Sequence, residues 1–191
     1  MTQFEPRNLF SFVKEVIVVL IGVLIALFIN EWRETKNNEQ FVSSVLAAVE
    51  KDIISSKEDL KEVSDKHIRT IDTMAVYLND EQLSIVEIIE GVGGIQIAQT
   101  KNISLNYMVG NRAELLDYEL ISLLTNIEST RELLDNKFDK FLNYAYETVE
   151  ATDAKSKRIF IIHLSNVIDS ELSLLELYDE FLEPDSTANS D

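Results

Sequence analysis

The chain of 191 residues contains no cysteine, which excludes disulfide bonds and thiol chemistry and is compatible with both reducing and oxidising compartments. It has only five glycines and two prolines, and the prolines, Pro6 and Pro184, lie near the two ends. Few residues therefore interrupt helices, while Leu, Ile, Glu and Lys are abundant. This composition predicts long helices.

Positive charge is scarce as well, since 17 Lys and Arg residues stand against 34 Asp and Glu residues and give a net charge of −17. No cluster of five or more basic residues occurs, so we predict no nucleic-acid partner. Residues 1–30 are neutral, because Arg7 and Lys14 balance Glu5 and Glu15. The whole negative charge thus belongs to residues 31–191.

Residue patterns that support chemistry are also missing. His67 and His163 lie on or beside apolar stripes, without the His-x-x-x-His or Glu-x-x-His spacing of a zinc site, so we predict no metal and no cofactor. No serine has a nucleophile-elbow setting, and the Gly91–Gly94 segment lacks the context of a phosphate-binding loop. Two acidic patches lack the ligand spacing of a calcium loop and are interpreted as solvated faces: Glu58, Asp59 and Glu62, and Asp179, Glu180, Glu183 and Asp185. We therefore expect no enzyme.

The chain does contain one long apolar run, Val16 to Ile29, of fourteen residues without a polar side chain. Fourteen helical residues cover only about 21 Å, whereas a bilayer core is about 30 Å thick. Extension back to Leu9 provides the missing length and includes Lys14 and Glu15 near one end, where they can reach the headgroups. We predict a single transmembrane helix over residues 9–30.

The residues at the ends of this span fit an interfacial setting. Phe10, Phe12 and Trp32 bracket it as an aromatic belt does, and Asn30 follows the apolar run directly. Glu15 is a candidate functional group because it is ionisable and lies at the edge of the span, with pairing to Lys14 as the alternative. The predicted anchor and interface residues are Phe10, Phe12, Lys14, Glu15, Gly22, Ala26, Asn30 and Trp32.

Two features of the span leave alternatives open. Gly22 and Ala26 form a small-xxx-small pair that allows two membrane helices to approach, although such pairs also arise by chance. A cleaved signal peptide is disfavoured because bulky and charged residues follow the apolar run where a peptidase needs small ones. Basic residues are balanced on its two sides, so orientation rests on the short N-terminal tail, which favours an extracytoplasmic main domain.

Residues 41–183 have the periodicity of helices in an acidic domain. An apolar stripe runs over residues 41–79 with His67 in it and is interrupted by Ser56, where an apolar residue was due. It suits a bundle or a coiled-coil homodimer stalk. Three further stripes follow, over residues 115–127, 134–149 and 160–182, the last with an N-cap at Thr152-Asp153. The fold class is therefore all-α, one transmembrane helix followed by an antiparallel bundle of about four helices.

The remaining segments complete the expected organisation. Residues 1–8 form an N-terminal tail, residues 31–40 a helical stalk, and residues 184–191 a disordered tail. A connector over residues 80–110 contains a short helix that ends at Gly91 and a glycine-rich turn. Its part from Ile95 to Ser104 permits a short strand, but no pairing partner lies nearby in the sequence.

The run from Ile21 to Leu27, followed by Ile29-Asn30, Trp32 and Glu34, resembles the signature I-G-x-L-I-A-L-x-I-N-x-W of a family of small bacterial single-pass membrane proteins of unknown function. Glu15 matches an acidic position of that family, and Leu105 to Leu124 is similar to its short helix, turn and helix. This chain departs from the usual Gln, Asn and Asn at Phe28, Glu31 and Arg33. The resemblance implies a bacterial membrane protein with a helical soluble part and no particular activity.

Two functions agree with these features. The first is a membrane-anchored, non-enzymatic scaffold in the bacterial inner membrane that binds a protein partner or its own copy. The second is a sensory input module that binds a small ligand between its helices and signals through a separate chain, since this chain has no output domain. A closed polar cavity would favour sensing, and an exposed apolar patch would favour assembly.

Overall fold

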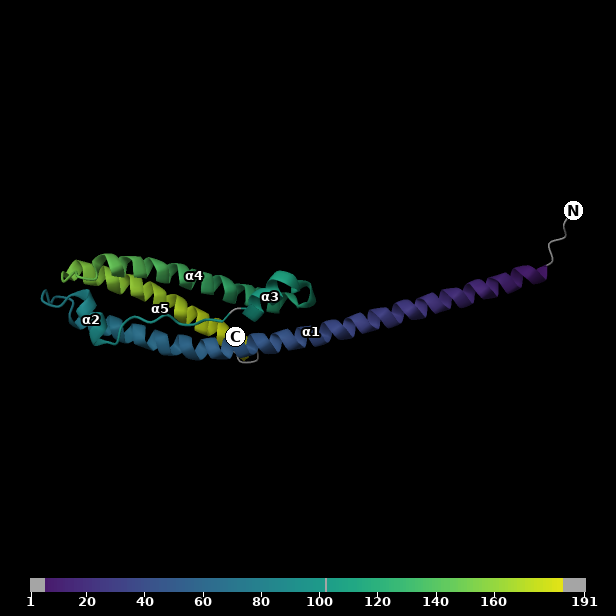
Figure 1. Ribbon diagram of the computed structural model, residues 1–191, viewed down its shortest axis with the longest axis horizontal. Coiled ribbons are helices and arrows are strands. Elements are labelled where there is room, and N and C mark those ends of the chain that lie inside the picture. The colour runs from purple at the N-terminus through teal and green to yellow at the C-terminus, as the bar shows by residue number, and fades with distance from the viewer. Residues whose placement is uncertain (1–5, 102, 184–191) are drawn as a thin grey trace, which may run out of the picture. The chain divides into compact units, whose positions relative to one another are not determined.

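The computed structural model describes residues 6–101 and 103–183 and divides into two compact units, Met1–Ser44 and Val45–Asp191. The predicted N-terminal tail and the disordered C-terminal tail fall largely or wholly outside the described residues. All regular elements in the described part are helices, so the all-α prediction is confirmed for these residues. They are α1 (Pro6–Val76), α2 (Ile85–Gly91), α3 (Ile103–Asn111), the short 3-10 helix η1 (Ala113–Leu115), α4 (Tyr118–Thr148) and α5 (Ala154–Leu182) (Figure 1).

Helix α1 is unbroken for 71 residues and includes the predicted membrane span, the predicted stalk and the first long segment of the acidic domain. Its only proline is Pro6, in the first turn, where the missing N–H costs nothing, and its only glycine is Gly22. Since no other residue interrupts the helical ladder, the predicted continuation through residues 31–40 is confirmed as helix.

The second unit is a helical bundle with three long segments, namely the part of α1 from Val45, α4 and α5, to which the short helices α2 and α3 add. Helices α4 and α5 lie side by side and form the most extensive backbone contact of the helix pairs in this unit (Figure 1). One core cluster draws on all five elements, with fully buried side chains that include Leu60, Ile85, Leu124, Phe141 and Leu164. The expected antiparallel bundle of about four helices is not confirmed.

One sequence interpretation of this unit is wrong. The separate helices expected over residues 115–127 and 134–149 are one helix, α4, because Glu128 to Leu133 contain no breaker and Arg131 pairs with Asp135 one turn later at 2.8 Å. Helix α3 begins inside the segment expected to be a connector, where the family resemblance implies a short helix. It is short, and it is held by burial of Leu105 and Met108, which only the folded bundle provides.

The predicted cap of α5 is confirmed, and the structure shows a second cap at α2. Asp153 caps α5 by accepting a hydrogen bond from the Ser156 N–H at 3.0 Å, which lowers the pKa of its carboxyl. Helix α2 begins with a capping box in which Ser84 and Glu87 exchange hydrogen bonds, and these bonds lower the pKa of Glu87. Gly93, at φ 93°, turns the chain after α2.

Candidate functional site

The apolar segment of α1 is exposed on every side. Each large apolar side chain from Phe10 to Trp32 is between 42% and 70% exposed. The most apolar window of 18 residues has a mean hydropathy of 2.8, and none of it is buried inside the protein. A core helix of a soluble protein keeps its apolar face covered, so this segment does not fit that class. By length and composition it is a helix able to cross a membrane.

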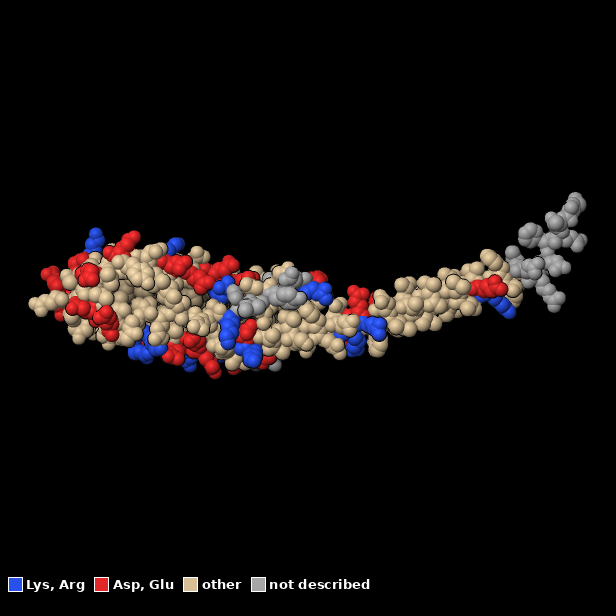
Figure 2. All heavy atoms as spheres, viewed as in Figure 1, with Lys and Arg blue, Asp and Glu red and all other residues tan. Residues whose placement is uncertain are grey.

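Charged residues flank this segment and are absent from its middle, as the space-filling view shows for the apolar stretch of α1 (Figure 2). At the N-terminal end, the Lys14 ammonium lies 4.8 Å from the centre of the Phe10 ring, one turn earlier, a cation–π contact. No ion pair between Lys14 and Glu15 occurs in the described part of the chain. Neighbouring helical residues point about 100° apart, which explains why Lys14 contacts Phe10 instead.

The small residues of the span leave an open surface. A Cβ atom added at Gly22 would meet no atom within 4 Å. Ala26 lies one turn later on the same face, and both residues are exposed. This face therefore offers close approach to another helix, which stays a prediction.

In the second unit, Ser56 occupies an apolar position of the α1 stripe and bonds backbone groups in the interior. Its side chain is fully buried, and its hydroxyl donates to the Asp52 carbonyl at 2.7 Å. The same oxygen accepts the backbone N–H of Lys101 at 2.8 Å and is hydrogen-bonded to the Tyr178 hydroxyl. The Ser56 hydroxyl thus donates to its own helix and accepts from Lys101 in the interior of the bundle.

Residues 95–101 form a strap along α1, and the name is used for this segment below. The Gln96 carbonyl lies 3.0 Å from His67 Nε2, the Gln99 N–H donates to the Asp59 carboxylate, and Lys101 bonds Ser56. From Ser56 to His67 the helix rises about 16 Å over eleven residue steps. From Gln96 to Lys101 an extended chain covers about the same length in five steps. The strap is thus nearly extended, and side chains of α1 satisfy its backbone instead of a neighbouring strand.

His67 joins four parts of the bundle. Its Nδ1 lies 2.9 Å from Glu171 Oε1 on α5, its Nε2 faces the strap, and its ring lies 6.0 Å from that of Phe138 on α4. Both partners are almost fully buried, at 1% and 2% exposure. Because a carbonyl only accepts, Nε2 donates to Gln96. These contacts link the strap, α1 and α5.

This arrangement does not provide a catalytic base. Ser64 lies one turn before His67 and its buried hydroxyl has no hydrogen-bond partner among the described residues. Both ring nitrogens of His67 are already bonded, so neither is available to accept a proton from that hydroxyl. The sequence placed His67 in the apolar stripe, but nothing in it identified Glu171 or Gln96 as partners 104 and 29 residues away.

Lys157 is also buried among the described residues. Its role was not apparent from the sequence. Its side chain is fully buried and its ammonium donates to the carbonyls of Tyr77 at 3.0 Å and Asp80 at 2.5 Å. These carbonyls follow the last turn of α1, where the helix dipole is negative. Lys157 therefore terminates α1 from a different helix, α5.

The remaining predicted residues lie apart from this network. His163 stacks on Tyr144 with ring centres 5.0 Å apart. Glu62 pairs with Lys66, which lowers the pKa of Glu62, and Asp179 pairs with Lys57. Within the described ranges, no group of three metal-ligating side chains forms. Asp185, the last member of the second acidic patch, lies outside those ranges.

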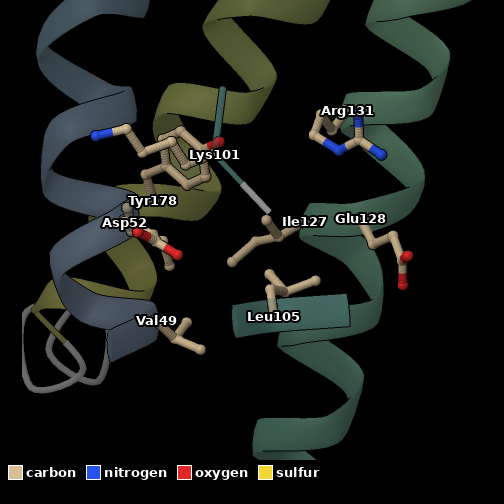
Figure 3. A pocket seen from close by; sticks show the side chains of 9 residues that line it. Val49, Asp52, Lys101, Leu105, Ile127, Glu128, Arg131 and Tyr178 are labelled. Carbon is tan, nitrogen blue, oxygen red and sulfur yellow. The ribbon is translucent and has the colours of Figure 1, made fainter. Parts of the chain in front are cut away.

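Several hollows lie in the part of the bundle that the structure describes. Between α1, α4 and α5 a cavity of about 10 Å³ is lined by Asp52, Lys101, Arg131 and Tyr178 among others, and their side chains are drawn in Figure 3. This volume holds about one water molecule. Two larger hollows are open grooves, of about 500 Å³ beside Leu120 and Phe181 and of about 210 Å³ beside Ile68 and Ile168.

No protein-family model matches this chain, and no curated protein or solved structure matches it either. The resemblance of the membrane segment to a bacterial single-pass family therefore stays an expectation.

Proposed function

We propose that this chain is a non-enzymatic scaffold anchored in the bacterial inner membrane, of the single-pass kind that its membrane segment resembles. Helix α1 crosses the bilayer once over residues 9–30, and the acidic domain, an antiparallel helical bundle, lies on the extracytoplasmic side. The observation that carries the proposal is the exposure of every large apolar side chain from Phe10 to Trp32. Burial of one such side chain in an apolar medium contributes about 1.5–3 kcal/mol, so the segment strongly favours lipid over water.

The interior of the bundle supports a scaffold rather than a small-molecule sensor. Ligand pockets usually measure about 300–1,000 Å³, whereas the cavity between α1, α4 and α5 measures about 10 Å³ and the hollow of about 500 Å³ is open to solvent. Several buried polar groups of the described part also bind one another, as in the pair of His67 with Glu171, although Ser64 Oγ and Glu171 Oε2 have no hydrogen-bond partner there. A domain of this kind interacts through its surface, which points to a protein partner.

Membrane anchoring is tested by alkaline carbonate extraction of membranes that contain the full-length chain. We expect the protein to stay in the pellet. A variant with Leu20→Glu and Leu24→Glu places two charges within the apolar run and is expected to be released, because each charge at the bilayer centre costs about 3 kcal/mol. Release of the unaltered chain would contradict the anchor.

Orientation is tested by thiol labelling, since the chain has no cysteine and gives no background. An Asp139→Cys variant places one thiol on the exposed surface of α4. We expect a membrane-impermeant maleimide to label it in intact spheroplasts. An Ala26→Cys variant serves as the control, because the bilayer shields that position in either orientation. Labelling of position 139 only after lysis would place the domain in the cytoplasm.

A further inference from the structure

The larger groove of the bundle, called the acidic groove below, is formed by the start of α4, the end of α5 and the adjacent part of α1. It has a volume of about 500 Å³ and is open to solvent. Its lining residues are Leu46, Asp117, Glu119, Leu120, Leu123, Glu180 and Phe181. The four apolar ones are only partly buried, and three of them pack against the core cluster, so the floor is apolar and firmly supported.

The rim of the groove carries only negative charge. Its three charged residues are all acidic, and no Lys or Arg lines it. Asp117 accepts the Leu120 N–H as the cap of α4, but Glu119 and Glu180 make no ion pair in the part of the chain that the structure describes. The neighbour of Glu180, Asp179, does pair with a lysine, Lys57. The acids that face the groove thus keep their charge available to a partner.

Charge decides between the possible occupants. A second copy of this chain also carries a charge of −17, so rim acids and the approaching domain repel each other. Anionic lipid headgroups are repelled for the same reason. A helix with an apolar stripe and flanking Lys or Arg satisfies both the floor and the rim, which is the usual way in which an amphipathic helix occupies an apolar groove.

We propose that the acidic groove binds a basic amphipathic helix of a partner protein, whose apolar side chains contact Leu120, Leu123 and Phe181 and whose cations pair with Glu119 and Glu180. This inference rests on the proposed scaffold function and gives it a binding surface and a class of partner.

The test uses the full-length chain in native membranes, with the photoreactive residue benzoylphenylalanine in place of Leu123. The same residue in place of Leu133, which is half exposed on α4 and does not line the groove, serves as the control position. After irradiation, the crosslinked peptide is sequenced. We expect a covalent adduct at position 123 with a peptide of a different protein that has net positive charge and apolar residues at helical spacing.

A charge reversal separates specific docking from general attraction to an acidic domain. The variant Glu119→Lys with Glu180→Lys reverses the rim, and Glu132→Lys with Asp139→Lys reverses two exposed acids elsewhere on α4. The rim variant is expected to lower the adduct yield at position 123 about tenfold, and the control variant to leave it within about twofold. Equal helix content of both variants shows that the fold is retained.

The proposal is overturned if the adduct at position 123 contains a second copy, lipid or an acidic segment, or if no adduct forms there. It is also overturned if both charge-reversal variants lower the yield equally. An adduct at position 133 without one at position 123 leaves the scaffold intact and removes the groove. Release of the chain by carbonate, together with the expected adduct, removes the anchor and leaves the groove.

Discussion

Replacement of Tyr178 by Phe should make the bundle less stable near neutral pH and more stable at alkaline pH. Burial raises the pKa of Tyr178 to about 12, from 10.0 for the free side chain. The folded chain therefore keeps the phenolic proton between about pH 10 and pH 12, while the unfolded chain loses it. Since the folded state then binds more protons, the free energy of unfolding falls as pH rises through this window.

The magnitude follows from the shift. A difference of two pKa units corresponds to about 2.7 kcal/mol well above pH 12, and about 2.3 kcal/mol of it is reached at pH 12, where the folded side chain is half ionised. A phenylalanine does not impose this cost on the folded state. Near pH 8 the variant loses only the hydrogen bond with Ser56, about 1 kcal/mol, because Ser56 keeps the Lys101 N–H and the Asp52 carbonyl. The two effects predict that the variant is less stable by about 1 kcal/mol near pH 8 and more stable by about 1.3 kcal/mol near pH 12.

The assay is urea unfolding of the full-length chain in detergent, followed by helix content, at several pH values for both proteins. The remaining ionisable groups are shared, so the difference between the proteins isolates Tyr178. The difference in tyrosinate absorbance between them reports the same ionisation directly. A stability difference that does not change between pH 8 and pH 12 would refute the reasoning, because Tyr178 would then ionise equally in the folded and unfolded states.

Further predictions concern the buried ions and the turn after α2. Lys157→Met removes the donor of the Asp80 carbonyl, while the Tyr77 carbonyl keeps the Asp80 N–H, and should lower the free energy of unfolding by about 1–3 kcal/mol; Lys155→Met, on the exposed surface, should have little effect in the same urea assay. His67→Leu or Glu171→Leu should each cost about 3–5 kcal/mol, and the double variant should cost less than the sum of the two; an additive result would mean that the pair does not interact. Gly93→Ala should cost about 1–2 kcal/mol because φ is 93° there, and an unchanged urea midpoint would show that this turn relaxes freely.

Much of the helical content was accessible from the sequence because few residues break helices and apolar residues recur at helical spacing. The short helix before Gly91 and the cap at Asp153 were recognisable from local chemistry. The division of α4 into two helices is wrong, since no breaker residue separates its two apolar stripes. Helix α3 has no clear apolar pattern of its own, and the burial of Leu105 and Met108 that supports it depends on the folded bundle.

Of the candidate sites, one is visible in the sequence and the others depend on tertiary packing. The apolar segment of α1 is visible in the sequence because its residues are consecutive. The acidic groove and the polar network require residues that are remote in the chain to lie together. Nothing in the sequence indicates that the strap contacts α1, or that α5 contacts the end of α1. Both contacts depend on how the helices pack.

The sequence by itself determined that the chain has an apolar helix near its N-terminus, an acidic remainder and a helical fold. Each of these properties is local, since it depends on the residues within a few turns or on their total charge. Only the tertiary structure decided that Ser56, His67 and Lys157 are buried and fully engaged. A buried polar group is stable only where partners from other segments complete its hydrogen bonds, and those partners are brought together by folding.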